Sequence, residues 1–168
     1  MEKSFDSIQV TYKQDSFRNN RGRIITNTYT NNSLVKNESA AYGSMAIPCD
    51  CVVEKDTVFV NMVIGFFGGF GYDIKIYKDS FQSSFFEYTD DVKPYKSNIS
   101  DTAFTDFVTA KSKYQYLILD KTPAFQHGQQ LTGLLTLTTN HYYNLAGDKL
   151  DSTFVTGKVY FTCTTKRK

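Results

Sequence analysis

The sequence predicts an all-β fold: an antiparallel β-sandwich of about eight to ten strands, with at most one short helix. A closed up-and-down β-barrel is the alternative architecture. Three observations support this class. Many short segments alternate apolar and polar residues, turn-forming residues separate them, and helical crossovers long enough for a parallel sheet are missing. The chain has 168 residues, which predicts one domain spanning positions 1–168.

The first third of the chain contains alternating segments of strand type. Residues 7–14 and 23–30 are predicted to form a hairpin across a turn rich in asparagine. The polar stretch 31–41 is predicted to be a loop. Residues 42–47 and 51–54 are predicted to be short strands on either side of a proline.

The middle of the chain predicts a buried strand followed by a hairpin. Residues 57–67 are apolar on both faces, which indicates a central strand. The glycine-rich stretch 65–71 interrupts that pattern and predicts a bend packed with phenylalanine. Residues 72–78 and 81–89 alternate on either side of a tight turn and therefore predict the second clear hairpin.

One helix candidate follows a loop at residues 90–101. Residues 101–113 place Phe104, Phe107 and Val108 at the spacing of one helical face, and a serine or aspartate could cap the first turn. The threonines of the same segment suit a strand as well, so a strand is the alternative there.

The last third returns to the strand pattern. Residues 114–119, 130–139 and 153–164 are predicted strands, because apolar residues alternate or dominate in each. Residues 121–129 turn the chain, and residues 140–152 are predicted to form a loop.

The cysteines and histidines do not predict a metal site, and no cofactor is predicted. Cys49, Cys51, Cys163, His127 and His141 contain enough nitrogen and sulfur ligands for zinc. However, a Cys-x-Cys spacing without a second close pair is not a zinc signature. We interpret the three cysteines as buried thiols, or as one disulfide with one thiol left over, because an odd count cannot pair completely.

The charge and hydropathy of the chain exclude several classes of partner. A formal net charge of +2 gives no strong field toward nucleic acid, so no nucleic-acid partner is predicted. The longest apolar stretch, residues 58–70, is too short and too often interrupted for a transmembrane helix. Residues 1–6 lack the apolar region of a signal peptide, which fits a cytosolic protein or a mature exported domain. The polar composition, rich in Thr, Ser, Asn and Lys, favours export to the periplasm or the outside of the cell.

Tyrosines in two predicted loops are the best candidates for a binding surface. Tyr142 and Tyr143, together with His141, occupy the loop at 140–152, and Tyr95 lies in the loop at 90–101. Tyrosine offers a large contact area and a polar hydroxyl. The sequence therefore predicts a non-catalytic binding or interaction module, surface-associated or exported, whose partner is an unidentified glycan, peptide or protein.

Two other functions remain open. A barrel could hold an apolar small molecule in its interior. A small hydrolase could use His127 or His141 as a base, but no nucleophile motif accompanies either residue. Two of the acids Glu87, Asp90 and Asp91 could form a pair of catalytic carboxylates. We interpret all three as solvated turn residues.

Overall fold

The computed structural model describes residues 20–40 and 47–168, and this part of the chain contains strands and no helix. The predicted segments 7–14 and 42–46 lie outside the described residues. The strands are β1 (Arg21–Thr30), β2 (Ser33–Ala40), β3 (Ile47–Glu54), β4 (Thr57–Gly65), β5 (Gly68–Ile76), β6 (Phe81–Thr89), β7 (Tyr95–Lys96), β8 (Phe107–Leu119), β9 (Gln130–Thr139), β10 (Tyr142–Ala146), β11 (Lys149–Thr164) and β12 (Lys166–Arg167).

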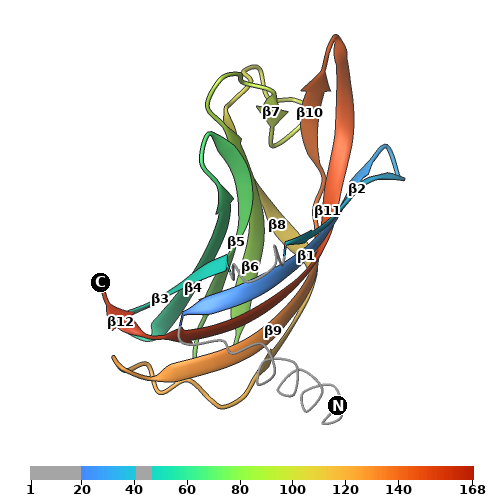
Figure 1. Ribbon diagram of the computed structural model, residues 1–168. Coiled ribbons are helices and arrows are strands. Elements are labelled where there is room, and N and C mark those ends of the chain that lie inside the picture. The colour runs from blue at the N-terminus through green and yellow to red at the C-terminus, as the bar shows by residue number, and fades with distance from the viewer. Residues whose placement is uncertain (1–19, 41–46) are drawn as a thin grey trace.

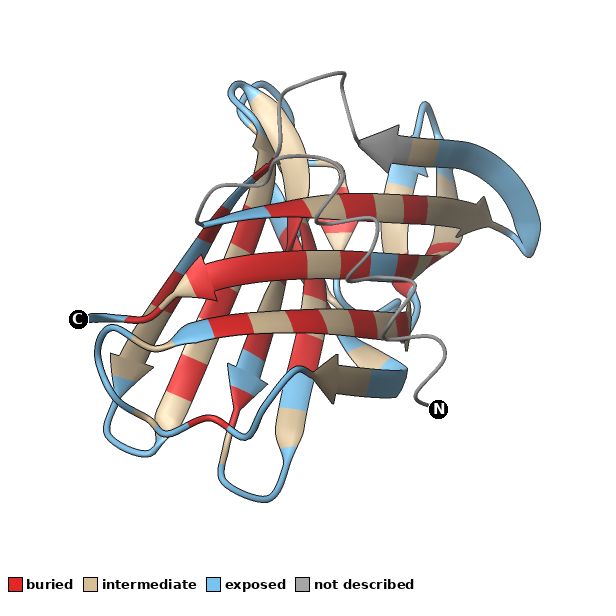
Figure 2. Ribbon diagram, turned by 60° about the horizontal axis from the view of Figure 1, so that its bottom comes forward, coloured by how far each residue is buried: buried red, intermediate tan, exposed pale blue. Residues whose placement is uncertain are grey.

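Eight of these strands close into an antiparallel barrel in the order β1-β3-β4-β5-β6-β8-β9-β11, and β11 pairs with β1 to complete the ring (Figure 1). This confirms the all-β class and the barrel alternative. The sandwich is also a rough description, because β1 and β3 share only two residue pairs, at Arg21 and Gly22. Strands before and after that corner cross each other steeply in Figure 2. The remaining strands extend the wall: β2 beside β1, β10 and β7 beyond β11, and β12 beside β3.

The interior follows from the two-residue period of a strand, in which alternate side chains point to opposite faces. Buried and partly exposed residues alternate along β1, β4, β9 and β11 (Figure 2). Aromatic side chains fill much of the barrel, and the largest fully buried ones are Tyr72, Tyr142 and Phe161. The predicted inward face of the last strand, which includes Val155, Val159, Phe161 and Cys163, is confirmed.

The predicted loop at 31–41 is wrong, because β2 occupies most of it. Asn31 and Asn32 have φ angles of 49° and 65°, and Thr30 pairs directly with Ser33. Two consecutive residues with positive φ make the tight turn that matches the twist of a hairpin, and asparagine tolerates this conformation better than most residues. The sequence signal for the hairpin was therefore the Asn-Asn pair.

The predicted helix at 101–113 is also wrong. β8 runs from Phe107 to Leu119, and Val108 and Ala110 point into the core at a spacing of two. Pairing with β6 satisfies the backbone over this stretch, and tertiary pairing of this kind overrides a weak helical period.

The glycine-rich stretch does not form a bend packed with phenylalanine. It forms the turn between β4 and β5, where Gly65 has a φ of 118° and pairs with Gly69. Phe66 and Phe67 lie on the turn and are 94% and 82% exposed. The predicted change of chain direction is therefore confirmed, but the prediction that phenylalanine packs the bend is wrong for these two exposed rings.

Candidate functional site

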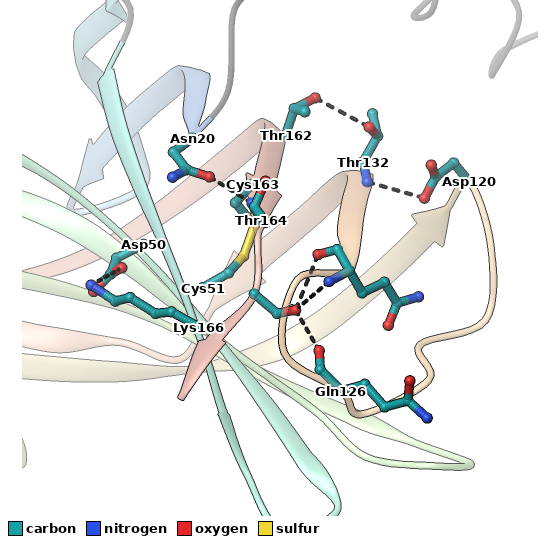
Figure 3. Close-up of a disulfide and its surroundings, with 12 residues drawn as sticks. Asn20, Asp50, Cys51, Asp120, Gln126, Thr132, Thr162, Cys163, Thr164 and Lys166 are labelled. Carbon is teal, nitrogen blue, oxygen red and sulfur yellow. Dashed lines mark hydrogen bonds and ion pairs between the residues drawn. A yellow bond between two sulfur atoms is a disulfide. The ribbon is translucent and has the colours of Figure 1, made fainter. Parts of the chain in front are cut away.

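A disulfide joins two strands that are distant in sequence, at the end of the barrel near the C-terminus. Cys51 of β3 bonds to Cys163 of β11, at a sequence separation of 112 (Figure 3). Lys166 extends the same region and pairs with Asp50 at 2.8 Å. The parallel pairing of β12 with β3 continues this attachment. The C-terminal segment is thus fixed to the barrel by covalent, ionic and backbone contacts.

Cys49 is the thiol left over, as the odd count predicted. Its sulfur and those of Cys51 and Cys163 all lie within 4.8 Å of one another. Two of these sulfurs are joined in the disulfide, and a disulfide sulfur is not the thiolate that binds zinc. Burial, and to a smaller extent the charge of Asp50, raises the pKa of the Cys49 thiol far above its ordinary value. The thiol is therefore inert in this state.

The other end of the barrel contains a polar cluster, which we call the tyrosine–glutamate cluster: the buried side chains of Tyr72, Tyr95 and Tyr142 and the half-buried side chain of Glu87. The Tyr142 hydroxyl donates to Glu87 Oε2 at 2.7 Å, and the Tyr95 hydroxyl also hydrogen-bonds to this carboxyl. The rings of Tyr95 and Tyr142 meet edge to face, with centroids 6.4 Å apart. β7 and β10, which supply these two tyrosines, are paired and lie together at the top of Figure 1.

Burial is the main influence on the Glu87 carboxyl and raises its pKa above the ordinary value. The hydrogen bond from Tyr142 acts in the opposite direction, as do the charge of Lys36 and the hydrogen bond from Tyr95. Glu38 raises the pKa slightly by like-charge repulsion. The interpretation of Glu87 as a solvated turn residue is therefore wrong, because the side chain points from β6 into the cluster.

Tyr72 of β5 is fully buried. Its hydroxyl shares a hydrogen bond with Thr26 Oγ1 at 2.8 Å, and its ring meets Phe85 with centroids 5.4 Å apart. Gly157 of β11 makes room for it, since a Cβ at that position would lie 2.5 Å from the Tyr72 hydroxyl oxygen. A glycine on β11 thus permits a tyrosine on β5 to lie across the barrel.

The structure separates the four predicted binding residues into two groups. Tyr142 and Tyr95 are 1% and 5% exposed and lie in strands, so the expectation of exposed loop tyrosines is wrong for both. His141 lies on the outer surface, where Nδ1 is 2.7 Å from Ser152 Oγ and the ring packs against Phe154. Tyr143, which alternates with Tyr142, pairs with Lys96 across β7 and β10. Whether any of the four binds a ligand stays a prediction.

The two histidines lie apart from the cluster. His127 Nδ1 is 3.0 Å from the Thr165 carbonyl oxygen, near the disulfide end. His141 and Ser152 form an exposed hydrogen-bonded pair, but among the described residues no carboxylate contacts this imidazole. A serine nucleophile normally needs a base that a third group orients.

Sequence reasoning missed the central acid of the cluster. Glu87 follows Phe81, Ser83 and Phe85 on one face of β6, and a charged residue in an inward register was the available signal. Its partner Tyr142 lies 55 positions further along the chain, which no local pattern could reveal.

Comparison of the chain with protein-family models, with curated proteins and with solved structures finds no match. Within residues 20–40 and 47–168, no helix is long and apolar enough to cross a membrane. Evidence about function therefore comes from the arrangement of the side chains.

Proposed function

We propose that this protein is a non-catalytic binding module that recognises a small polar ligand through the tyrosine–glutamate cluster. One observation carries the proposal: an ionisable, half-buried carboxyl, Glu87, accepts a hydrogen bond from Tyr142 and interacts with the Tyr95 hydroxyl at one end of the barrel. Placing a carboxylate in such surroundings costs free energy. Buried acids with perturbed pKa values are concentrated at functional sites.

The chemistry of the cluster favours a ligand that carries an amine or several hydroxyl groups. Glu87 can accept more hydrogen bonds than the tyrosines supply, since a carboxylate has about four lone-pair sites. A ligand ammonium would also offset the effect of burial on this carboxyl. An amino sugar combines both kinds of donor, and this agrees with the glycan class of partner that the sequence suggested.

Two features support binding over the alternatives. The candidate bases His127 and His141 lie away from Glu87, at the Thr165 carbonyl and on the outer surface, which disfavours a hydrolase built on the cluster. The closed barrel is the scaffold that an apolar ligand would need, but Tyr72, Tyr142 and Phe161 are fully buried in its core.

The disulfide supports an exported location as part of this proposal. Disulfides persist in oxidising compartments such as the periplasm and the extracellular space, and they are rare in the cytosol. The Cys51–Cys163 bond is buried between β3 and β11.

The test is a thermal-shift screen against glucosamine, glucose, cellobiose, putrescine and palmitate, with isothermal titration of each compound that raises the midpoint. A ligand at about 100 times its Kd stabilises the folded state by about 2.7 kcal/mol. We expect glucosamine or putrescine to stabilise the wild type and to lose at least tenfold in affinity with Glu87→Gln. Glu54→Gln is the matched control, because it makes the same substitution in an exposed ion pair with Lys168, away from the cluster.

Equal affinity of a ligand for the wild type and for Glu87→Gln would show that binding does not use the cluster. Binding of palmitate alone would favour the apolar-ligand barrel instead.

A further inference from the structure

The barrel wall contains a seam between β6 and β8, which we define as Phe81–Ser83 of β6 facing Ser112–Leu119 of β8. Pairing between the two strands begins only at Ser84 and Lys111. Beyond that point β8 turns to β9, with a register irregularity between Ser112 and Tyr114. Among the described strands, β6 therefore has no backbone partner on this side over its first three residues.

The side chain of Gln115 fills part of the seam in the way a strand would. Its Oε1 accepts from the Ser83 backbone N–H at 2.9 Å, and its Nε2 donates to the Phe81 carbonyl at 3.1 Å. A primary amide carries the same donor and acceptor as a peptide group. Gln115 thus imitates one residue of a missing antiparallel strand.

Two hollows lie along the seam, and Gln115 lines the first of them. A hollow of about 410 Å³ is lined by Ser83 and Gln115 together with residues of β5 and β8. A second hollow of about 450 Å³ is lined by Phe81, Leu117 and Leu119 with the turn between β5 and β6. The first offers hydroxyls and charges, and the second offers apolar side chains.

We propose that the seam is a docking site for an extended segment of a partner polypeptide, which pairs its backbone with Phe81–Ser83 in place of the Gln115 side chain. Strand addition of this kind takes its affinity from backbone hydrogen bonds and its specificity from alternate side chains. Three residues of β6 span roughly 10 Å, which suits a short segment. Every second side chain of that segment would face Leu117 and Leu119.

The charges along the seam favour an acidic segment. Lys75 and Lys111 accompany Asp73 around the first hollow. Lys78 and Lys121 accompany Asp79 around the second. Each hollow therefore has an excess of one positive charge, and electrostatic complementarity selects the partner. The site is separate from the tyrosine–glutamate cluster, so either proposal can fail alone.

The test uses an array of capped heptapeptides in which Val, Ile, Leu or Phe alternates with Glu, Thr or Lys. Peptides that bind are then titrated against the wild type, Gln115→Ala, Lys111→Glu and the control Gln130→Ala, an exposed glutamine outside the seam. We expect glutamate-containing peptides to bind the wild type. Binding to Gln115→Ala should be roughly tenfold tighter, because the peptide no longer competes with the two hydrogen bonds between the Gln115 side chain and the backbone of β6.

Two further results distinguish backbone pairing from adventitious binding. N-methylation of alternate peptide nitrogens should abolish binding, and Lys111→Glu should shift the preference from glutamate to lysine. The second result keeps the test valid if Gln115→Ala does not fold. The proposal is overturned if no peptide binds folded protein, or if N-methylated peptides bind equally well. A concentration-dependent dimer that Gln115→Ala strengthens would identify a second copy as the occupant and would also overturn it.

Discussion

At each end of the barrel a side-chain contact joins strands that are distant in sequence, but the two contacts differ in kind. At one end a covalent bond joins Cys51 and Cys163. At the other end hydroxyls meet an ionisable acid, with Tyr142 donating to Glu87. A covalent link within the core does not respond to pH or to a polar ligand, whereas a buried carboxyl responds to both. The covalent cross-link and the ionisable contact therefore lie at different ends of the barrel.

The largest expected effect is at the disulfide end. The double substitution Cys51→Ala and Cys163→Ala should lower the free energy of unfolding by about 4–5 kcal/mol, because the bond closes a loop of roughly 100 residues in the unfolded chain. Urea unfolding with and without dithiothreitol measures the loss. Cys49→Ala is the control, which should keep the sensitivity of the wild type to reductant. If the double variant unfolded at the same urea midpoint as the wild type, the disulfide would not stabilise the fold.

The second effect tests the close packing of Tyr72 against Gly157. Gly157→Ala should cost about 2–3 kcal/mol, because the added methyl overlaps the Tyr72 side chain and overpacked cores lose free energy of this size. Tyr72→Phe in the same chain should recover part of the loss by removing the closest atom. Thermal unfolding of the four proteins in a double-mutant cycle measures the coupling. If the two changes in the free energy of unfolding were strictly additive, Gly157→Ala would not destabilise the fold through contact with the Tyr72 hydroxyl.

The third effect concerns a single hydrogen bond. Tyr142→Phe should lower the free energy of unfolding by about 1.5–2 kcal/mol, since Glu87 Oε2 loses a hydrogen-bond donor while the ring stays in place. Tyr143→Phe, one position along β10, should have little effect. Denaturant titration at pH 7 compares the two. Equal losses would mean that the hydroxyl of Tyr142 has no special role.

The smallest effect is the pH dependence of stability that Glu87 contributes. Its folded pKa is raised above the ordinary value of 4.5, so the folded state holds the proton more tightly than the unfolded state does. This contribution is complete below pH 4.5 and is lost as the pH rises through the folded pKa. Relative to Glu87→Gln, the wild type should therefore become less stable as the pH rises from 4.5 through the folded pKa of Glu87. Urea unfolding across that range measures the difference, and parallel curves for the two proteins would disprove it.

Local pattern predicted much of the fold. The segments at 81–89, 130–139 and 153–164 alternate strongly, and each is a strand with nearly the predicted bounds. Failures occurred where a local signal was weak or had two readings. The Asn31-Asn32 pair is also common in loops, and the side chains of the segment beginning at Asp101 fit either a helix or a strand.

The candidate site was less predictable than the fold. Tyr95 and Tyr142 were selected for their ring and hydroxyl chemistry, but sequence placed them in exposed loops instead of buried strands. Glu87 was assigned to solvent because two aspartates follow it closely, and turn composition suggested exposure. Nothing in the sequence singles out Gln115. Its side chain hydrogen-bonds to the backbone of β6 where no strand pairs with that backbone, and only the tertiary structure shows this.

The sequence by itself determined that residues 81–89, 130–139 and 153–164 are extended and which side of each faces inward, because both depend on a two-residue period within one segment. It also determined that one of three cysteines would lack an intramolecular disulfide partner. Only the tertiary structure decided that the wall closes, that Cys51 takes Cys163, and that Glu87 meets Tyr142. The two contacts join positions that are 112 and 55 residues apart in the sequence. The order of the strands in the barrel brings these positions together, and a short stretch of sequence does not contain that order.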